Sequence, residues 1–537
     1  MFGFHSRSRS LIPVGDLEKT GGTQISWNDV TPEQEEEEVA VQSPRECRNL
    51  IMIYLLFLAE AIMSSSLSSQ INLLLPSTSA CLTMDTTFLR SILQCAYYFG
   101  GASGIVFGLA ADRLGRRKVA LFGLIGMSTC CISMGFATNF TAFCILRYIA
   151  GAIGSAATVA GLAMLADSTH GSKRRVKVIA RLPMLAVCGQ LGPLLSNAIR
   201  QLAQDHFAGV FARFPGLGVQ MACAALVISI AVAEICLLDE TLPKNDPKDF
   251  EQDEYVDCEK AAFLGQQRSS TDSNDSLAIS IIEALNDDTA TPRPSRISVS
   301  QMLTAPSILV LLASYAVLSL HSSTFEVVLQ HIAHTDAENA GMGIPCSWMQ
   351  PLMLVVKAVA ALRVMHFIPK LVSNGSVLPL YRKISMVFPA LYIIIPAVAL
   401  AVHATGAAPI LSAVVSTMAT LAKTTLANAA QVLVLLLVLS AAPDASSTGT
   451  LIGVVSITEL FKALAVGLAG ISYYVSDSHS MFVINTSLWA ALAAIALVGT
   501  LLTTKLRAAP RLGPDLPSEC FVWQGMFDVE SDDEAGF

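Results

Sequence analysis

The stretch "GLAADRLGRRKV", residues 108 to 119, places five charged side chains between two long apolar runs. It stands out because the 537-residue chain is 53% hydrophobic and only 14% charged, with a mean hydropathy of +0.56. That composition is typical of membrane proteins and excludes an ordinary soluble domain. A helix of about 20 residues, rising about 1.5 Å per residue, crosses the hydrocarbon core of a bilayer. The apolar runs are that long, so the sequence predicts transmembrane helices.

Twelve apolar segments, six on each side of a polar stretch, predict an all-α membrane protein of two six-helix bundles. The first six are expected over residues 49–75, 88–111, 119–137, 141–166, 177–199 and 216–238. The second six are expected over residues 307–330, 347–368, 384–404, 409–438, 448–475 and 481–503. Polar composition predicts disorder outside the bundles. The N-terminal bundle is expected over residues 49–238 and the C-terminal bundle over 307–504. The polar parts are a tail at 1–48, a linker at 239–306 and a second tail at 505–537.

Basic residues in the short loops predict the orientation, because Lys and Arg are retained on the cytoplasmic side. The loops after spans 2, 4 and 8 and the tail after span 12 are basic, whereas the loops after spans 3, 9 and 11 contain no Lys or Arg. Even-numbered loops and both termini are therefore expected to be cytoplasmic. The net charge is −8, and many of the Asp and Glu residues lie in the tails and the linker. Nothing in this charge distribution indicates nucleic-acid binding.

The opening stretch resembles the signature that follows the second span in the major facilitator superfamily. The signature matches at Gly108, Asp112, Arg113, Gly115, Arg116 and Arg117. A second similarity is "LDETLPK" after span 6, where Glu240, Thr241 and Leu242 resemble a short family motif. Within the superfamily, the first half is most similar to the fungal and plant branch of tetracycline-resistance-like and zinc-induced-facilitator-like multidrug exporters. The resemblance implies the major facilitator fold, in which two bundles rock about a central cavity.

The resemblance also implies a gate at the cytoplasmic end of the bundles. Asp112 is expected to face a helix of the other half, and an arginine of the signature is expected to bond an acid at the end of span 4, for which Asp167 is placed. Carboxylate and guanidinium attract each other more strongly at this depth than in water. Such contacts are expected to hold the cytoplasmic side shut.

Span 5 contains "GQLGPLLSN", which resembles the Gly-Pro motif of proton-coupled antiporters. The similarity rests on Gly189, Gly192 and Pro193. The stretch departs from the motif because Cys188 replaces one glycine and Ser196 and Asn197 replace the closing pair. These departures weaken the case for an antiporter.

Ionisable residues inside the spans are candidates for proton coupling or substrate binding, since a charge there costs at least about 2.5 kcal/mol unless it is paired or hydrated. Glu60 lies about 17 Å into span 1 at about 1.5 Å per residue. Arg147 in span 4 is expected to pair with Glu60 or with an anionic substrate group; a structural role is the alternative for both residues.

The second half carries more charge inside its spans than the first. Glu459 and Lys462 are spaced to pair with each other on one helix. Lys357 and Lys423 have no such partner in their own spans, so they are expected to face the cavity and favour an anionic substrate. Glu326 in span 7 is the expected counter-charge.

These features predict a secondary transporter rather than an enzyme. The sequence contains no phosphate-binding glycine-rich loop, and no cofactor or metal site is predicted. The leading hypothesis is proton-coupled efflux of a drug or secondary metabolite. Proton-coupled import of an organic anion and a carrier-like nutrient sensor are the alternatives.

The remaining expectations concern partners and location. A small-molecule substrate, protons and the lipid bilayer are the expected partners of a monomer. The plasma membrane is favoured over the vacuolar membrane by resemblance alone. Asn139 heads a sequon in an outer loop and is a glycosylation candidate.

Overall fold

The structure is a computed structural model, and within the residues it describes the regular secondary structure is entirely helical. Those residues are 44–66, 84–137, 139–169, 172–190, 214, 216–242, 299, 306–335, 339, 341, 342, 344, 346–373, 376–405, 409–442, 447–475 and 481–506.

Eleven helical spans in the described residues are long and apolar enough to cross a membrane. The N-terminal half contributes α2 (Pro44–Ser65), α4 (Met84–Gly101) with α5 (Gly104–Leu114), α6 (Arg116–Phe136), α7 (Phe140–Asp167) and α12 (Leu217–Leu237). The C-terminal half contributes α16 (Pro306–His334), α17 (Cys346–Ser373), α18 (Val377–Ala404), α19 (Pro409–Ser440), α20 (Thr448–Val455) with α21 (Thr458–Val475), and α22 (Met481–Lys505).

The fifth expected span is described only in part. Its first portion forms two short helices, α8 (Ser172–Ile179) and α9 (Leu182–Gly189). The helix break coincides with Pro183 near the start of α9, where proline fits because the first turn needs no donor. The rest of the expected span lies outside the described residues.

Among the eleven spans described in full, two are interrupted, one in each half, and the interruptions meet. The first break separates α4 from α5 within the small-residue stretch "GGASG", and the second separates α20 from α21. A Cβ atom on Gly104 would lie 2.6 Å from the Cβ of Ser456, so the backbones approach closely at this point. The Ser456 hydroxyl also donates to the carbonyl of Ala102 at 3.5 Å.

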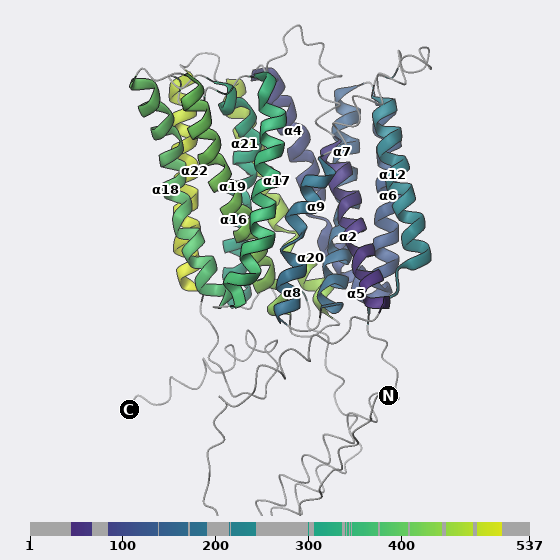
Figure 1. Cartoon of the computed structure of the whole chain (residues 1–537). Helices are drawn as coiled ribbons and strands as arrows, with labels where there is room; N and C mark the ends of the chain where they lie inside the picture. Colours follow the sequence, from purple (N-terminus) through teal and green to yellow (C-terminus); the bar gives the residue numbers. More distant parts are fainter. Residues whose placement is uncertain are drawn as a thin grey trace, which may run out of the picture. The chain divides into compact units, whose positions relative to one another are not determined.

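The described residues from Arg48 onward form one compact unit in which the two halves pack against each other. Within the halves, α6 packs on α7 and α12, and α18 packs on α19 and α22 (Figure 1). Between the halves, α4 packs along α21 and α5 along α20. Small residues allow close approach within membranes, as at Gly123, whose added Cβ would lie 2.8 Å from the backbone nitrogen of Ala157.

The outward surface is apolar and the interior carries the buried charges. Leu468, Leu114 and Val106 are more than 60% exposed, at 66%, 63% and 62%. Arg116 and Arg147 are by contrast fully buried. This arrangement suits a chain surrounded by lipid, where apolar side chains face outward and polar groups satisfy one another inside.

Candidate functional site

Asp112 links the two halves at the end of α5. Its carboxylate accepts hydrogen bonds from the backbone nitrogen of Gly449 at 3.1 Å and from the backbone nitrogen and hydroxyl of Thr450 at 2.5 and 2.8 Å. These donors belong to the first turn of α20, whose N–H groups have no partner inside the helix. The carboxylate is buried and also complements the positive end of the helix dipole. A side chain of the N-terminal half therefore caps a helix of the C-terminal half.

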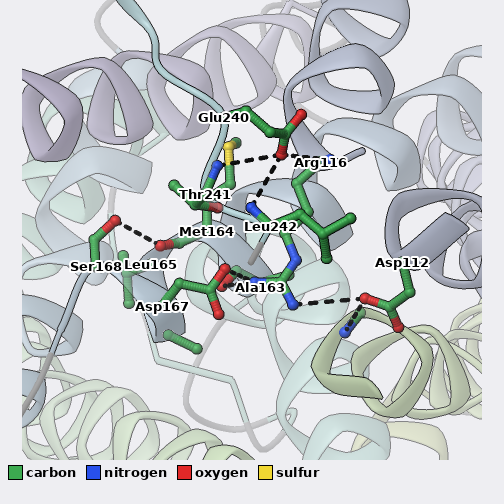
Figure 2. Close-up of polar contacts among 12 residues, drawn as sticks. Asp112, Arg116, Ala163, Met164, Leu165, Asp167, Ser168, Glu240, Thr241 and Leu242 are labelled. Atoms are coloured by element: carbon green, nitrogen blue, oxygen red, sulfur yellow. Dashed lines mark hydrogen bonds and ion pairs between the residues drawn. The ribbon is translucent and has the colours of Figure 1, made fainter. Parts of the chain in front are cut away.

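Arg116, the first residue of α6, joins three helices of the N-terminal half (Figure 2). Its Nη1 forms an ion pair with Asp167 and donates to the carbonyl of Ala163 at 3.2 Å. Its Nη2 lies 3.6 Å from the Asp112 Oδ1. Arg116 is therefore the arginine that meets Asp167, and two carboxylates compensate its buried charge.

Glu240, just after α12, caps the start of α6. Its carboxylate accepts from the backbone nitrogen of Arg116 at 2.9 Å (Figure 2). It also accepts from the backbone nitrogen of Arg117 at 3.2 Å. The turn before α6 requires Gly115, whose φ of +106° disfavours any side chain. An added Cβ there would also lie 2.6 Å from Glu240 Oε2. The family-like motif after span 6 thus contacts the signature directly.

The other signature residues surround this network. An added Cβ on Gly108 would lie 2.4 Å from the carbonyl oxygen of Gly449, so α5 and α20 touch through their backbones. Arg117 donates from Nη2 to the carbonyl of Ile235 on α12 at 2.6 Å. Arg113 is exposed. The signature therefore divides into residues that join helices and a basic residue that faces outward.

Glu60 and Arg147 meet through Tyr97 rather than through a direct ion pair. The Tyr97 hydroxyl donates to Glu60 Oε1 at 2.7 Å, and the Arg147 guanidinium lies 4.4 Å from the centre of the Tyr97 ring. Arg147 donates to the carbonyls of Met63 and Ser64 at 3.3 and 2.8 Å, near the end of α2. A guanidinium satisfies the terminal carbonyls of a helix well, which explains why it does not pair with Glu60.

A cavity of about 370 Å³ lies between the two halves. Glu326 of α16, Lys357 of α17 and Lys462 of α21 line it, together with Tyr98 of α4 and side chains of α8, α9 and α19. Lys462 pairs with Glu459 at 2.5 Å, whereas Glu326 and Lys357 form no ion pair with each other. The cavity therefore offers both signs of charge to a bound molecule.

Lys423 differs from the expectation because it lies behind the cavity wall. Its side chain is buried, with Nζ 4.0 Å from the centre of the Phe325 ring and 3.5 Å from the hydroxyl of Ser322. Ser322 itself lines the cavity. The hydroxyl and the aromatic ring give this buried side chain a polar contact and a π contact. Lys423 thus lies behind the wall and does not touch the cavity.

The comparisons with known proteins decide the family. The model of the Major Facilitator Superfamily matches residues 50–468, which is most of the chain. The chain belongs to the Major Facilitator Superfamily. It is therefore a multi-pass membrane transporter and not an enzyme.

Relatives and solved structures of the superfamily agree with this assignment. The chain is 22% identical over 451 residues to the major facilitator superfamily multidrug transporter mfsB of Aspergillus fumigatus, covering 74% of this chain and 73% of that one. Its fold is similar to that of the human organic anion transporter MFSD10, with a TM-score of 0.57, 17% identity and coverage of 86% and 100%. The proton:xylose symporter XylE gives a TM-score of 0.60, 13% identity and coverage of 87% and 97%.

The remaining predicted site residues are only partly described. Gly189 packs α9 against α2, since an added Cβ would lie 2.4 Å from the Cβ of Ala61. Gly192 and Pro193 lie outside the described residues. Asn139 is exposed directly before α7, and its glycosylation stays a prediction.

Sequence reasoning on this superfamily member missed two residues that the structure makes prominent. Tyr97 connects Glu60 with Arg147, and its only signal in the sequence is a hydroxyl-bearing aromatic within an apolar run. Glu234 of α12 is fully buried, and its carboxylate oxygens have no hydrogen-bond partner among the described residues. Glu234 lies three residues before the end of α12, and no motif in the sequence singles it out.

Proposed function

We propose that this superfamily member exports a small organic molecule in exchange for protons, with Glu60 as the proton-binding residue. The observation that carries the proposal is the chain of contacts from Glu60 through Tyr97 to Arg147. Gain or loss of a proton on Glu60 changes the hydrogen bond of the Tyr97 hydroxyl. The Tyr97 ring packs against the Arg147 guanidinium, which binds carbonyls at the end of α2. A change in the protonation of Glu60 therefore alters the contacts at the end of this helix.

The contacts of Asp112 and Arg116 supply the gate in this proposal. Asp112 joins α5 to α20 across the two halves, and Arg116 lies beside its carboxylate, so the Asp112 contacts must break when the cavity opens to the predicted cytoplasmic side. Charge-assisted hydrogen bonds of this kind are worth about 1.5–3 kcal/mol each. That is enough to favour the closed state and small enough to be overcome by ligand or proton binding. The multidrug transporter named among the relatives supports export as the direction.

The test measures pH-dependent efflux from cells that carry the chain, using a panel of labelled drugs and metabolites. Efflux is expected to rise when the outside is acidified, and the Glu60→Gln variant is expected to lose this dependence on pH. Tyr97→Phe keeps the acid but removes its donor, so it is expected to shift the pH dependence rather than abolish it. Insertion and expression are checked by surface labelling.

A second buried acid provides the comparison. Glu234 is fully buried in α12 and does not line the central cavity. Glu234→Gln is expected to retain pH-dependent efflux. If Glu234→Gln removes the pH dependence while Glu60→Gln preserves it, Glu60 is not the coupling residue.

Import of an organic anion is the second candidate, favoured by the charges around the cavity. Three lysines, Lys357, Lys423 and Lys462, lie in the cavity wall or just behind it. Two carboxylates, Glu326 and Glu459, lie in the same region of the described residues. An anionic group would gain most from Lys357. Transport of a carboxylate is then expected to exceed that of its methyl ester, Lys357→Gln is expected to remove the preference, and Lys357→Arg is expected to keep it. Equal transport of acid and ester would rule this candidate out.

The other expectations from the sequence stay predictions. A monomer in the plasma membrane, with the vacuolar membrane as the alternative, is consistent with a multi-pass transporter. The sensor hypothesis depends on the linker at 239–306, most of which lies outside the described residues. Deleting the linker is expected to leave flux intact in a transporter and to abolish signalling in a sensor.

A further inference from the structure

A second recess, of about 430 Å³, lies where α5, α6 and the chain after α12 meet. Arg113, Arg117 and Lys118 line it together with Leu114 and Leu121. It shares no lining residue with the central cavity. The recess is therefore separate from the central cavity, and it borders the gate network at Gly115 and Glu240.

The recess has a surplus of positive charge. Its single lining carboxylate, Glu240, already accepts hydrogen bonds from the backbone nitrogens at the start of α6 and from those of Thr241 and Leu242. None of the three basic side chains forms an ion pair with another residue that the structure describes. Arg117 donates to a backbone carbonyl, while Arg113 and Lys118 are exposed. Two cations therefore remain available to an anion at this point.

Apolar surface continues from the recess along both helices. On α6, Lys118 is followed at helical spacing by Phe122 and Ile125, which are 54% and 55% exposed. On α5, Leu114 and Val106 are likewise exposed on the outward side. A basic end that runs into an exposed apolar helix face matches a molecule with an anionic head and a hydrocarbon tail.

We propose that this recess binds the phosphate of an anionic phospholipid of the cytoplasmic leaflet, with Arg113 and Lys118 as the binding cations. Basic pockets at the cytoplasmic ends of transmembrane helices bind such headgroups through charge and hydrogen bonds. A free phosphate would use the cations but not the apolar faces, so the lipid fits the whole surface. The bound lipid would brace the turn at Gly115, which connects Asp112 with Arg116.

Native mass spectrometry of the purified full chain, titrated with dioleoylphosphatidylserine, tests the proposal. The wild-type chain is expected to bind this lipid, and the double variant Arg113→Gln with Lys118→Gln is expected to bind it about 30-fold more weakly, at about one kcal/mol per removed charge. Arg117 is left in place because it bonds α12. Size-exclusion chromatography verifies that the variants remain folded.

Matched variants separate the recess from general surface charge. Lys383→Gln with Lys505→Gln removes two exposed lysines from the same predicted side of the other half, and it is expected to leave binding unchanged. Arg113→Lys with Lys118→Arg keeps the charges and is expected to keep binding. Equal loss in the Lys383 and Lys505 double variant, or loss in the charge-keeping variant, would overturn the proposal.

Lipid chemistry provides the last arm of the experiment. Dioleoylphosphatidylcholine, which has no net charge, is expected to bind at least about tenfold more weakly than the serine lipid. Glycerol 3-phosphate is expected not to displace the lipid at equal concentration. Equal binding of the neutral lipid would refute an anion site, and displacement by glycerol 3-phosphate would show that the recess serves a soluble phosphate instead.

Discussion

At the scale of single residues, the contact that matters most joins Asp112 to the first turn of α20. A carboxylate supplies acceptors only, and its polar neighbours here are donors: two backbone N–H groups, the hydroxyl of Thr450 and the guanidinium of Arg116. The side chain is buried, so water does not replace a donor that is lost. Small chemical changes at this position are therefore expected to have large effects.

The first prediction changes this acceptor. In Asp112→Asn the NH2 group of the new amide faces N–H groups of the backbone, so a donor meets donors and a hydrogen bond is lost. Transport is therefore expected to be abolished, while membrane insertion stays intact. In a double-mutant cycle with Thr450→Val, the two changes are expected to couple by about 1–2 kcal/mol in unfolding free energy. Unfolding in detergent and flux assays measure the two effects. Normal transport by Asp112→Asn, or strict additivity with Thr450→Val, would show that this contact does not act as a gate.

Tyr97 shows why the candidate site needed the structure at this scale. From the sequence, Glu60 and Arg147 were natural partners because both are charged and both lie within spans. In the folded chain the aromatic ring separates them, and the arginine uses its donors on carbonyl oxygens instead. The sequence predicted the charges in this site but not the residue that connects them.

At the scale of helices, the halves meet through glycine-lined contacts. Gly108 of α5 faces Gly449 and Gly453 of α20, with an added Cβ 2.4 Å from the carbonyl oxygen of one and 2.9 Å from the Cα of the other. Backbone atoms cannot rotate away as side chains do. The same approach places Asp112, one turn later on α5, within reach of the start of α20.

The second prediction concerns this helix contact. Gly108→Ala is expected to push α5 from α20 and to destabilise the closed state by about 1–3 kcal/mol, measured as a lower thermal unfolding midpoint. Gly467→Ala on α21 is the control, because its added Cβ meets only the Cys95 side chain, with Sγ at 3.4 Å and Cβ at 3.9 Å. The control is expected to be neutral or slightly stabilising, since alanine favours a helix more than glycine does. Equal destabilisation by both variants would argue against a specific backbone contact at Gly108.

At the scale of the whole molecule, transport by alternating access requires that the two halves move against each other. The structure offers a way to stop that motion with one substitution. Cys95 of α4 and Gly467 of α21 belong to different halves, and an added Cβ on Gly467 would lie 3.9 Å from the Cβ of Cys95. That separation suits a disulfide, whose Cβ atoms lie about 3.5–4.5 Å apart.

The third prediction follows from this geometry. Gly467→Cys is expected to form a disulfide with the native Cys95 under mild oxidation, to stop transport, and to recover on reduction with dithiothreitol. Mass spectrometry of the linked peptides verifies the bond. Gly467→Cys with Cys95→Ser is expected to transport under both conditions, and full activity of the cross-linked chain would show that these helices need not separate.

The sequence by itself determined the spans and the superfamily, whereas the division into two six-helix bundles stays a prediction. The spans are recognised from the mean hydropathy of neighbouring residues, and the signature at 108–117 is one continuous stretch. Neither the spans nor the signature depends on residues far away in the chain. Eleven of the expected spans appear in the described residues, and the family comparison agrees with the signature.

Only the tertiary structure decided which charged groups meet. Asp112 contacts a helix that begins more than 330 residues later, and Lys423 lies behind the cavity wall that Lys357 faces. A residue in a helix points in a direction set by its position around the axis and by how that helix packs. The sequence gives the position of a residue around the helix axis, but it does not give the packing of that helix against the others. The partners of buried charges therefore follow only from the packing.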